Sequence, residues 1–185
     1  MKKITISAIM AFFSVIAINA QDDSNISSTD FQYGLKAGYN SFIERFSLDG
    51  DSVSASGSGF YIGFFTDFSI SEKFNFQPEL LYVLVTHDNV NGDVLVLPLM
   101  GKYNIKENFS IQFGPQFDYI LEKDTEGIKR LGLGLAIGAG FDISQDLFMD
   151  MRYSFGLTDR LDEEYDNLDA KFKINYLQIG LGYRF

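Results

Sequence analysis

Hydrophobic and polar residues alternate with a period of two over most of the chain from residue 31 to its end. A β-strand places successive side chains on opposite faces, so this period predicts strands with one apolar and one polar face. Eight segments follow the pattern. They span residues 31–41, 58–69, 74–85, 94–104, 109–121, 131–143, 147–157 and 175–185.

The connections between these segments alternate between short and long. Three are short, at residues 70–73, 105–108 and 144–146, and four are longer, at residues 42–57, 86–93, 122–130 and 158–173. Outer-membrane barrels have short periplasmic turns and longer loops outside, and a tilted strand needs about 9–11 residues to cross. The pattern therefore predicts an all-β fold, an eight-stranded antiparallel up-and-down transmembrane β-barrel over residues 31–185.

Aromatic residues gather at both ends of the predicted strands, on the apolar face. If the first strand rises from the periplasm, the periplasmic ends carry Phe31, Phe68, Phe74, Tyr103, Phe109, Phe141, Tyr183 and Phe185. The opposite ends carry Tyr39, Phe60, Tyr82, Tyr119 and Phe155. Two such rings are typical of the two interfaces of a membrane barrel.

The first twenty residues are typical of a secretory signal peptide. Two lysines precede an uncharged run over residues 4–19, which is short for a membrane-spanning helix. We expect cleavage after Ala20, with cleavage after Ala17 as the alternative. Residues 21–30 are rich in Ser and Asp and are predicted to form a flexible leader.

The last predicted strand ends on a C-terminal phenylalanine. Its apolar face carries Leu177, Ile179, Leu181, Tyr183 and Phe185. This ending resembles the recognition signal of bacterial outer-membrane β-barrels, and the resemblance implies that the barrel-assembly machinery reads these residues.

Further segments resemble the outer-membrane β-barrel domain proteins of Gram-negative bacteria that are often labelled porin family. The matching segments are YGLKAGYN (33–40), FNFQPELLY (74–82), VLPLMGKYNI (96–105), IQFGPQFDYIL (111–121), MRYSFGLTD (151–159) and LGYRF (181–185). Together they cover essentially the whole chain after the leader. The resemblance implies an eight-stranded barrel in the outer membrane, and it supplies no catalytic residues to transfer.

Charged residues of both signs occupy the predicted inner face. A low-dielectric interior tolerates charges only when they pair, so we expect an ion-pair and amide network that fills the lumen. Tyr61, Phe65, Leu81, Val83 and Met100 are also predicted to point inward, and eight strands enclose a space just wide enough for side chains. The predicted network consists of Lys36, Asp67, Glu79, Lys102, Asp118, Asp142, Asp150, Arg152 and Arg184.

No pattern in the sequence points to catalysis, a cofactor or a metal ion. His87 is the only histidine, and no serine motif accompanies it. The acidic residues 159–169 are interpreted as a solvated loop surface, and a divalent cation that bridges to lipopolysaccharide phosphates is the alternative. The formal net charge of −10 argues against a nucleic-acid partner, because binding phosphates requires a basic surface.

The predicted function is that of a small, non-enzymatic outer-membrane barrel, structural or weakly pore-forming, with a largely filled lumen. One alternative is a surface module whose first and fourth loops bind a partner. The other is a barrel that carries a small apolar ligand near Leu81, Val83, Val94 and Val96. The expected partners are outer-membrane lipid, lipopolysaccharide and the barrel-assembly machinery, and the chain is expected to be a monomer.

Overall fold

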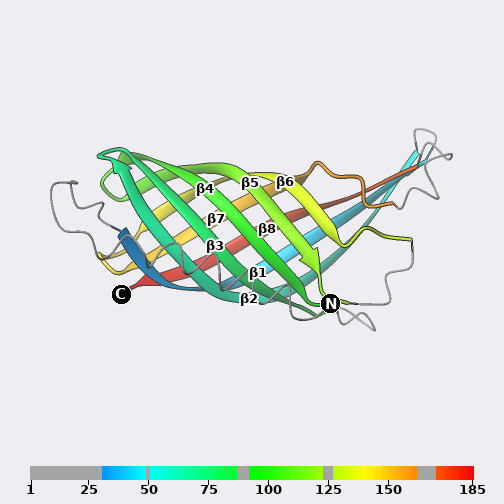
Figure 1. Cartoon of the computed structure of the whole chain (residues 1–185), viewed down its shortest axis with the longest axis horizontal. Helices are drawn as coiled ribbons and strands as arrows, with labels where there is room; N and C mark the ends of the chain where they lie inside the picture. Colours follow the sequence, from blue (N-terminus) through cyan, green and yellow to red (C-terminus); the bar gives the residue numbers. More distant parts are fainter. Residues whose placement is uncertain (1–30, 49–50, 87–91, 123–126, 162–169) are drawn as a thin grey trace, which may run out of the picture.

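The computed structural model describes residues 31–48, 51–86, 92–122, 127–161 and 170–185. In these segments eight strands pair antiparallel in sequence order, and the last strand pairs with the first to close a barrel (Figure 1). The strands are β1 (Phe31–Leu48), β2 (Asp51–Ser71), β3 (Phe74–Thr86), β4 (Val94–Lys106), β5 (Phe109–Ile120), β6 (Leu131–Asp142), β7 (Leu147–Gly156) and β8 (Ala170–Arg184). The predicted fold class is confirmed. The predicted signal peptide and leader lie outside the described residues.

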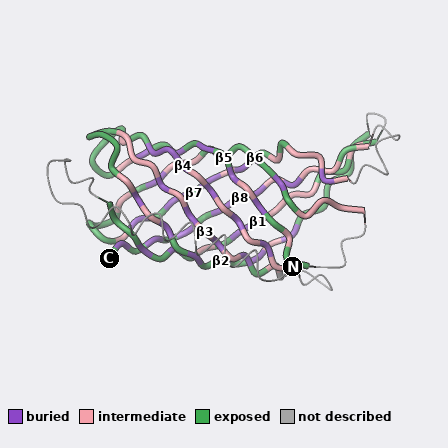
Figure 2. The backbone as a smooth tube through the Cα atoms, in the orientation of Figure 1, coloured by how far each residue is buried: buried purple, intermediate pink, exposed green. Residues whose placement is uncertain are grey.

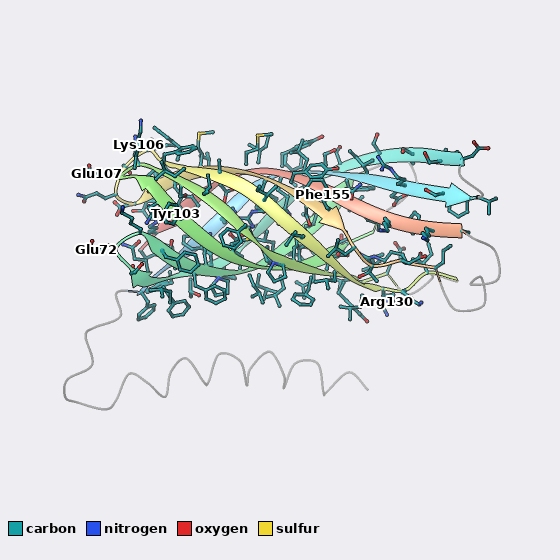
Figure 3. All side chains as sticks on the ribbon, turned by 90° about the horizontal axis from the view of Figure 1, so that it is seen from above. Glu72, Tyr103, Lys106, Glu107, Arg130 and Phe155 are labelled. Atoms are coloured by element: carbon teal, nitrogen blue, oxygen red, sulfur yellow. The ribbon has the colours of Figure 1, made fainter. Side chains whose placement is uncertain are left out.

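The two ends of the barrel differ in how the strands connect. At one end only a few residues join β2 to β3, β4 to β5 and β6 to β7, and we call this the turn end. The opposite end is called the loop end. Figure 3 labels Glu72 and Glu107 at the turn end and Arg130 at the loop end. Within the described segments, no helix has the length and apolar composition needed to cross a membrane.

Within the barrel wall, residues along each strand alternate between exposed and buried (Figure 2), as the outer and inner faces of a closed sheet require. In β6, Leu131, Leu135 and Ile137 are 51–60% exposed, whereas Ala136 between them is fully buried. An outer face of this composition suits lipid. Because the barrel is closed, each strand of the barrel wall pairs with a neighbour on both sides, as a hydrocarbon environment requires.

Three strands extend further at the loop end than the sequence predicted. Residues 42–57 were expected to be a loop, but β1 and β2 contain 18 and 21 residues and stay paired up to Leu48 and Asp51. The start of β8 pairs with the same part of β1, so residues 170–173 were also wrongly predicted as loop. We call residues 42–48, 51–57 and 170–174 the projecting sheet. In Figure 1 it extends beyond the other strands.

The projecting sheet reverses the polarity of the barrel wall. Positions that continue the outer face carry serines, three cations and Ile43, whereas positions that continue the inner face are mostly apolar, with Glu44 and Asp51 as charged exceptions. The outer positions include Arg45, Ser47, Ser52, Ser54, Ser56, Lys171 and Lys173, and the inner positions include Phe42, Phe46, Leu48, Val53, Phe172 and Ile174. On the inner side, Phe46 is 40% exposed and Val53 is 72% exposed.

Candidate functional site inside the barrel

Two cations and two anions meet in the middle of the lumen. Arg152 donates to Glu79 through Nη1 to Oε2 at 3.0 Å and through Nη2 to Oε1 at 2.7 Å. Lys36 Nζ lies 3.2 Å from Glu79 Oε2 and also pairs with Asp150. Arg152 Nη2 lies 3.1 Å from Asp150 Oδ2. We call Lys36, Glu79, Asp150 and Arg152 the central cluster, and their side chains are at most 1% exposed.

The central cluster joins parts of the barrel wall that are not adjacent. Lys36 lies on β1, Glu79 on β3, and Asp150 and Arg152 on β7. Gln112 of β5 accepts a further 3.0 Å hydrogen bond from Arg152. Removing charges from water is costly, and matched charges with a two-pronged guanidinium–carboxylate contact offset that cost. The side chains of four strands therefore meet across the lumen and occupy it.

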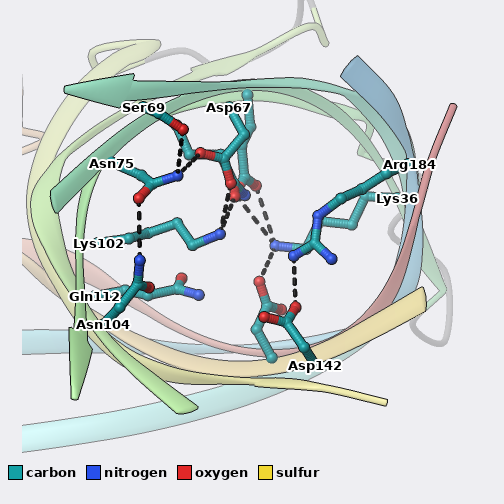
Figure 4. A network of polar contacts seen from close by, with 12 residues as sticks. Lys36, Asp67, Ser69, Asn75, Lys102, Asn104, Gln112, Asp142 and Arg184 are labelled. Carbon is teal, nitrogen blue, oxygen red and sulfur yellow. Dashed lines mark hydrogen bonds and ion pairs between the residues drawn. The ribbon is translucent and has the colours of Figure 1, made fainter. Parts of the chain in front are cut away.

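A second polar group lies nearer the turn end (Figure 4). Lys102 Nζ lies 2.6 Å from Asp67 Oδ2, and Arg184 Nη2 lies 2.5 Å from Asp142 Oδ1. The Phe148 ring lies close to both cations, with its centroid 5.5 Å from Lys102 Nζ and 4.5 Å from Arg184 Cζ. Cations over an aromatic face are attracted by the ring quadrupole. Phe65 packs against Phe148 with ring centroids 5.2 Å apart, so charged groups and two aromatic rings fill this part of the lumen.

A third group lies toward the loop end. Tyr176 Oη donates a 3.0 Å hydrogen bond to Asp118 Oδ2, and Arg160 pairs with the same carboxylate oxygen. Arg160 is only 2% exposed. Its guanidinium lies over Gly132, where a Cβ atom would be 2.6 Å from Arg160 Nε. Only glycine at position 132 leaves the space that this arginine occupies.

Apolar side chains fill the lumen beside β2, β3 and β4. Tyr61, Leu81, Val83, Val94 and Val96 form a buried cluster, and each is at most 8% exposed. The five side chains that were predicted to point inward are all at most 3% exposed. The inner surface at this height is therefore apolar on one side and polar on the other.

All nine residues of the predicted network face the lumen, and each takes part in at least one ion pair. The sequence could not divide them into three groups. It also missed Arg160, which was assigned to the last loop. The available signal was that Arg160 is the only cation among residues 158–170. Tyr176 lies on the inner face of the last predicted strand, but it was not included in the network.

The residues of the predicted assembly signal lie on the outer face of the closing strand. Ile179, Leu181 and Tyr183 are 41–52% exposed, and Phe185 is 64% exposed. Leu177 is partly exposed on the same face. The Phe185 amide donates to the Tyr33 carbonyl oxygen at 2.9 Å, so the last residue takes part in closing the barrel.

The remaining candidates from the sequence are His87 and the acidic loop. His87 and residues 162–169 of the acidic loop lie outside the described residues. In the part of the chain that the structure describes, no group of three or more His, Cys, Asp or Glu side chains is placed to hold a metal ion. The geometry that can be described is therefore that of a buried, charge-matched network.

The sequence comparison identifies the family. Residues 8–185 match the family model of the outer membrane protein beta-barrel domain. The chain belongs to this family. It is a protein of the Gram-negative outer membrane, and its apolar outer face suits lipid. The opacity protein opA50 of Neisseria gonorrhoeae is 33% identical over 63 residues, which are 34% of this chain and 24% of that protein.

Solved outer-membrane barrels are similar at low identity. Ail, the attachment invasion locus protein of Yersinia pestis, is 15% identical, with a TM-score of 0.49 over 84% of this chain and 99% of that one. OprG of Pseudomonas aeruginosa is 14% identical, with a TM-score of 0.46 over 85% of this chain and 97% of that one. Both scores are below 0.5, so membership rests on the family match.

Proposed function

We propose that the protein is a closed, non-enzymatic barrel that contributes structurally to the outer membrane and permits at most slight passage of solutes. The observation that carries this proposal is the central cluster, in which side chains of β1, β3 and β7 meet across the lumen. An ion that entered would have to displace matched charges that are already paired. Such displacement leaves buried charges uncompensated, which is strongly unfavourable.

Single-channel recording tests this proposal. The refolded chain is first shown to be folded by its faster migration when it is not boiled before a denaturing gel. It is then inserted into a planar bilayer. We expect no discrete conductance steps from the inserted wild-type protein. Discrete steps would contradict the closed lumen and make transport the function to pursue.

We propose lipopolysaccharide as a partner of the outward side of the projecting sheet. Arg45 and Lys173 are direct neighbours on β1 and β8, and Lys171 lies opposite Ser47. The described outward positions of this sheet include three cations and no Asp or Glu, although the chain carries a net charge of −10. Cations near an anionic membrane surface contribute about 1 kcal/mol each.

Replacing these three cations by glutamine tests the lipopolysaccharide proposal. The Arg45→Gln/Lys171→Gln/Lys173→Gln variant should bind lipopolysaccharide on the order of tenfold or more weakly in a titration with detergent-solubilised protein. The matched control changes Lys73 and Lys106, two exposed lysines at the turn end, to glutamine. Equal affinities of wild type and the triple variant would refute the partner.

We also propose that the barrel-assembly machinery reads the closing strand and that the mature protein is a monomer. Phe185 faces outward at the end of the seam between β8 and β1. Phe185→Asp places a charge in the lipid-facing position and should block insertion. If this variant reached the same level in the membrane as wild type, the assembly proposal would be refuted. The monomer proposal is tested on the wild-type protein in detergent, where a mass above that of one chain would refute it.

A second candidate function is binding of a partner at the cell surface. The segments that were predicted as the first and fourth loops contribute to one projecting sheet, whose inner side exposes Phe46, Leu48 and Val53 by 40%, 41% and 72%. Exposed apolar groups beyond the membrane favour an interaction surface.

The third candidate function, carriage of a small apolar ligand, is supported less well. The ligand would need space between side chains that pack against one another, namely Leu81, Val83, Val94 and Val96.

Attachment assays separate this second candidate from the structural one. Bacteria that produce the Phe46→Ser/Val53→Ser variant are compared with wild type for attachment to host-cell monolayers. The binding function predicts a loss of attachment while the unboiled protein keeps its faster gel migration. Unchanged attachment would favour the purely structural role.

A further inference from the structure

Three buried amide side chains in the outer half of the lumen lack the partners that buried amides usually have. Asn40 of β1 and Gln116 of β5 are 0% exposed, and Gln178 of β8 is 2% exposed. Neither the amide nitrogen nor the amide oxygen of any of the three has a hydrogen-bond partner among the described residues. The same holds for the hydroxyl group of Tyr61. The large majority of buried side-chain polar atoms in native proteins have a hydrogen-bond partner, so a group of this size points to a partner from outside the described chain.

Two buried amides nearer the turn end, those of Gln77 and Gln112, have hydrogen-bond partners. Gln77 donates to Glu79 at 2.6 Å and accepts from Lys102 at 2.9 Å. Gln112 accepts from Arg152 at 3.0 Å. Nε2 of Gln112 has no partner, and single atoms of Asp150, Arg152 and Arg184 also lack one, but each of these side chains is bonded through another atom. Asn40, Gln116 and Gln178 differ because both polar atoms of each amide lack a partner.

The strand registers place these groups at one level. Asn40 and Gln178 are direct neighbours across β1 and β8. Gln116 and Gln178 each lie one inward-facing position below Asp118 and Tyr176, which hydrogen-bond to each other across the lumen. The Tyr61 hydroxyl reaches the space beside Gly38, the inward-facing position below Asn40, where a Cβ atom would lie 2.7 Å from it.

Charged groups bound this level on both sides. The central cluster lies below it, and Gln178 is the register neighbour of Arg152. Asp118, Tyr176 and Arg160 lie above it. On its remaining side lies the apolar cluster that includes Leu81, Val83 and Val96. The amides thus lie between charged groups below and above and an apolar cluster on one side.

We propose that this region is a binding chamber for small uncharged molecules that both donate and accept hydrogen bonds. The occupant is uncharged because the cluster below holds two cations and two anions, and Asp118 above is paired with Arg160. It both donates and accepts because each amide offers a donor and an acceptor. Water is the smallest such molecule, and a neutral amide solute has the same chemistry. The chamber goes beyond the proposed structural function and does not depend on it.

Arg160 closes the chamber toward the loop end. Its backbone is held on two sides, because its amide donates to the Phe172 carbonyl oxygen at 2.8 Å and its carbonyl oxygen accepts from the Lys129 amide at 2.7 Å. Its side chain lies across Gly132 to reach Asp118. Arg160, together with Asp118 and Tyr176, thus lies between the amides and the outer mouth of the barrel.

Solution NMR of the full chain in lipid nanodiscs tests the occupant. We expect cross-relaxation between water and the side-chain amide protons of Asn40, Gln116 and Gln178, with the sign of long-lived bound water. Gln77 serves as the internal control because its amide is bonded within the protein. Acetamide is then titrated as a solute probe. A saturable shift of the three amides identifies a solute site, and water contacts without such a shift identify a water site. The absence of both would overturn the proposal.

Hydrogen exchange tests the closure. In Arg160→Ala, the side-chain amide protons of Gln116 and Gln178 should exchange with bulk water at least tenfold faster than in wild type. Arg130→Ala is the matched control, since Arg130 lies at the same end and its side chain hydrogen-bonds to the backbone carbonyl groups of residues 120 and 121 and lies over the Tyr119 ring, not over the lumen amides. Equal exchange in wild type and in a folded Arg160→Ala variant would refute the closure. Conductance by wild type would refute the closed barrel and leave the water contacts as a separate result.

Discussion

The barrel wall and the projecting sheet are built from the same strands but have opposite polarity. In β1, the aromatic Tyr39 faces outward and the polar Asn40 faces inward. Two residues later the polarity is exchanged, because Ser41 faces outward and Phe42 faces inward. The pairing of β1 with β2 continues through this point without a register shift. The reversal is therefore carried by side chains alone.

The difference teaches that the surroundings of each face decide its composition. Within the membrane the outer face meets lipid, so apolar residues lie outside and charged groups must pair with one another in the lumen. Beyond the membrane the outer face meets water and headgroups, so Ser47 and Lys173 are suited to it. We therefore predict that the edge of the lipid lies at the reversal, between Tyr39 and Ser41 on β1.

The largest expected effect comes from the inner face within the membrane. Glu79→Gln removes the carboxylate that pairs with both Lys36 and Arg152 and leaves a buried positive charge, so it should reduce the free energy of unfolding by about 3–5 kcal/mol. The measurement is urea unfolding in lipid vesicles, followed by the compact unboiled band. Asp142→Asn is the control, because the side chain of Asp142 is 40% exposed and its loss should cost less than about 1 kcal/mol.

The next largest loss of unfolding free energy is expected when a charge is placed on the outer face, and only at positions within the membrane. Phe64 and Ser56 both face outward on β2, and Phe64 is 62% exposed toward lipid. Phe64→Arg should reduce the free energy of unfolding by about 2–4 kcal/mol, because the charge would lie in hydrocarbon. Ser56→Arg should leave the same urea transition nearly unchanged. Similar losses in both variants would contradict the position of the lipid edge.

The smallest effect is expected on the inner face of the projecting sheet. Phe46 is 40% exposed, so Phe46→Ser gives up only part of the burial of a phenylalanine, about 1 kcal/mol. Urea unfolding again provides the measurement. A loss as large as that of Glu79→Gln would mean that the projecting sheet is part of the stability core rather than an addition to it.

The sequence predicted what depends on local alternation and missed what depends on distant partners. The inward charges and the outward aromatics follow from the period of two, and the fold class was therefore correct. Residues 51–57 include three serines and were predicted as part of a loop, because their strand structure depends on pairing with β1. Lys36 and Asp150 are 114 residues apart, and no local pattern indicates that they pair. Arg160 was missed for the same reason.

The edge of the lipid can be measured along the outer face of β8. The chain has no cysteine, so single cysteines for spin labels can be placed at Lys171, Lys173, Ile179 and Leu181. The protein is reconstituted in lipid bilayers, and collisions of each label with oxygen and with a water-soluble nickel chelate are compared. We predict nickel accessibility at positions 171 and 173 and oxygen accessibility at positions 179 and 181, with the change near residue 176. Oxygen accessibility that continues to position 171, or nickel accessibility at position 181, would contradict the reversal of polarity as the edge of the membrane.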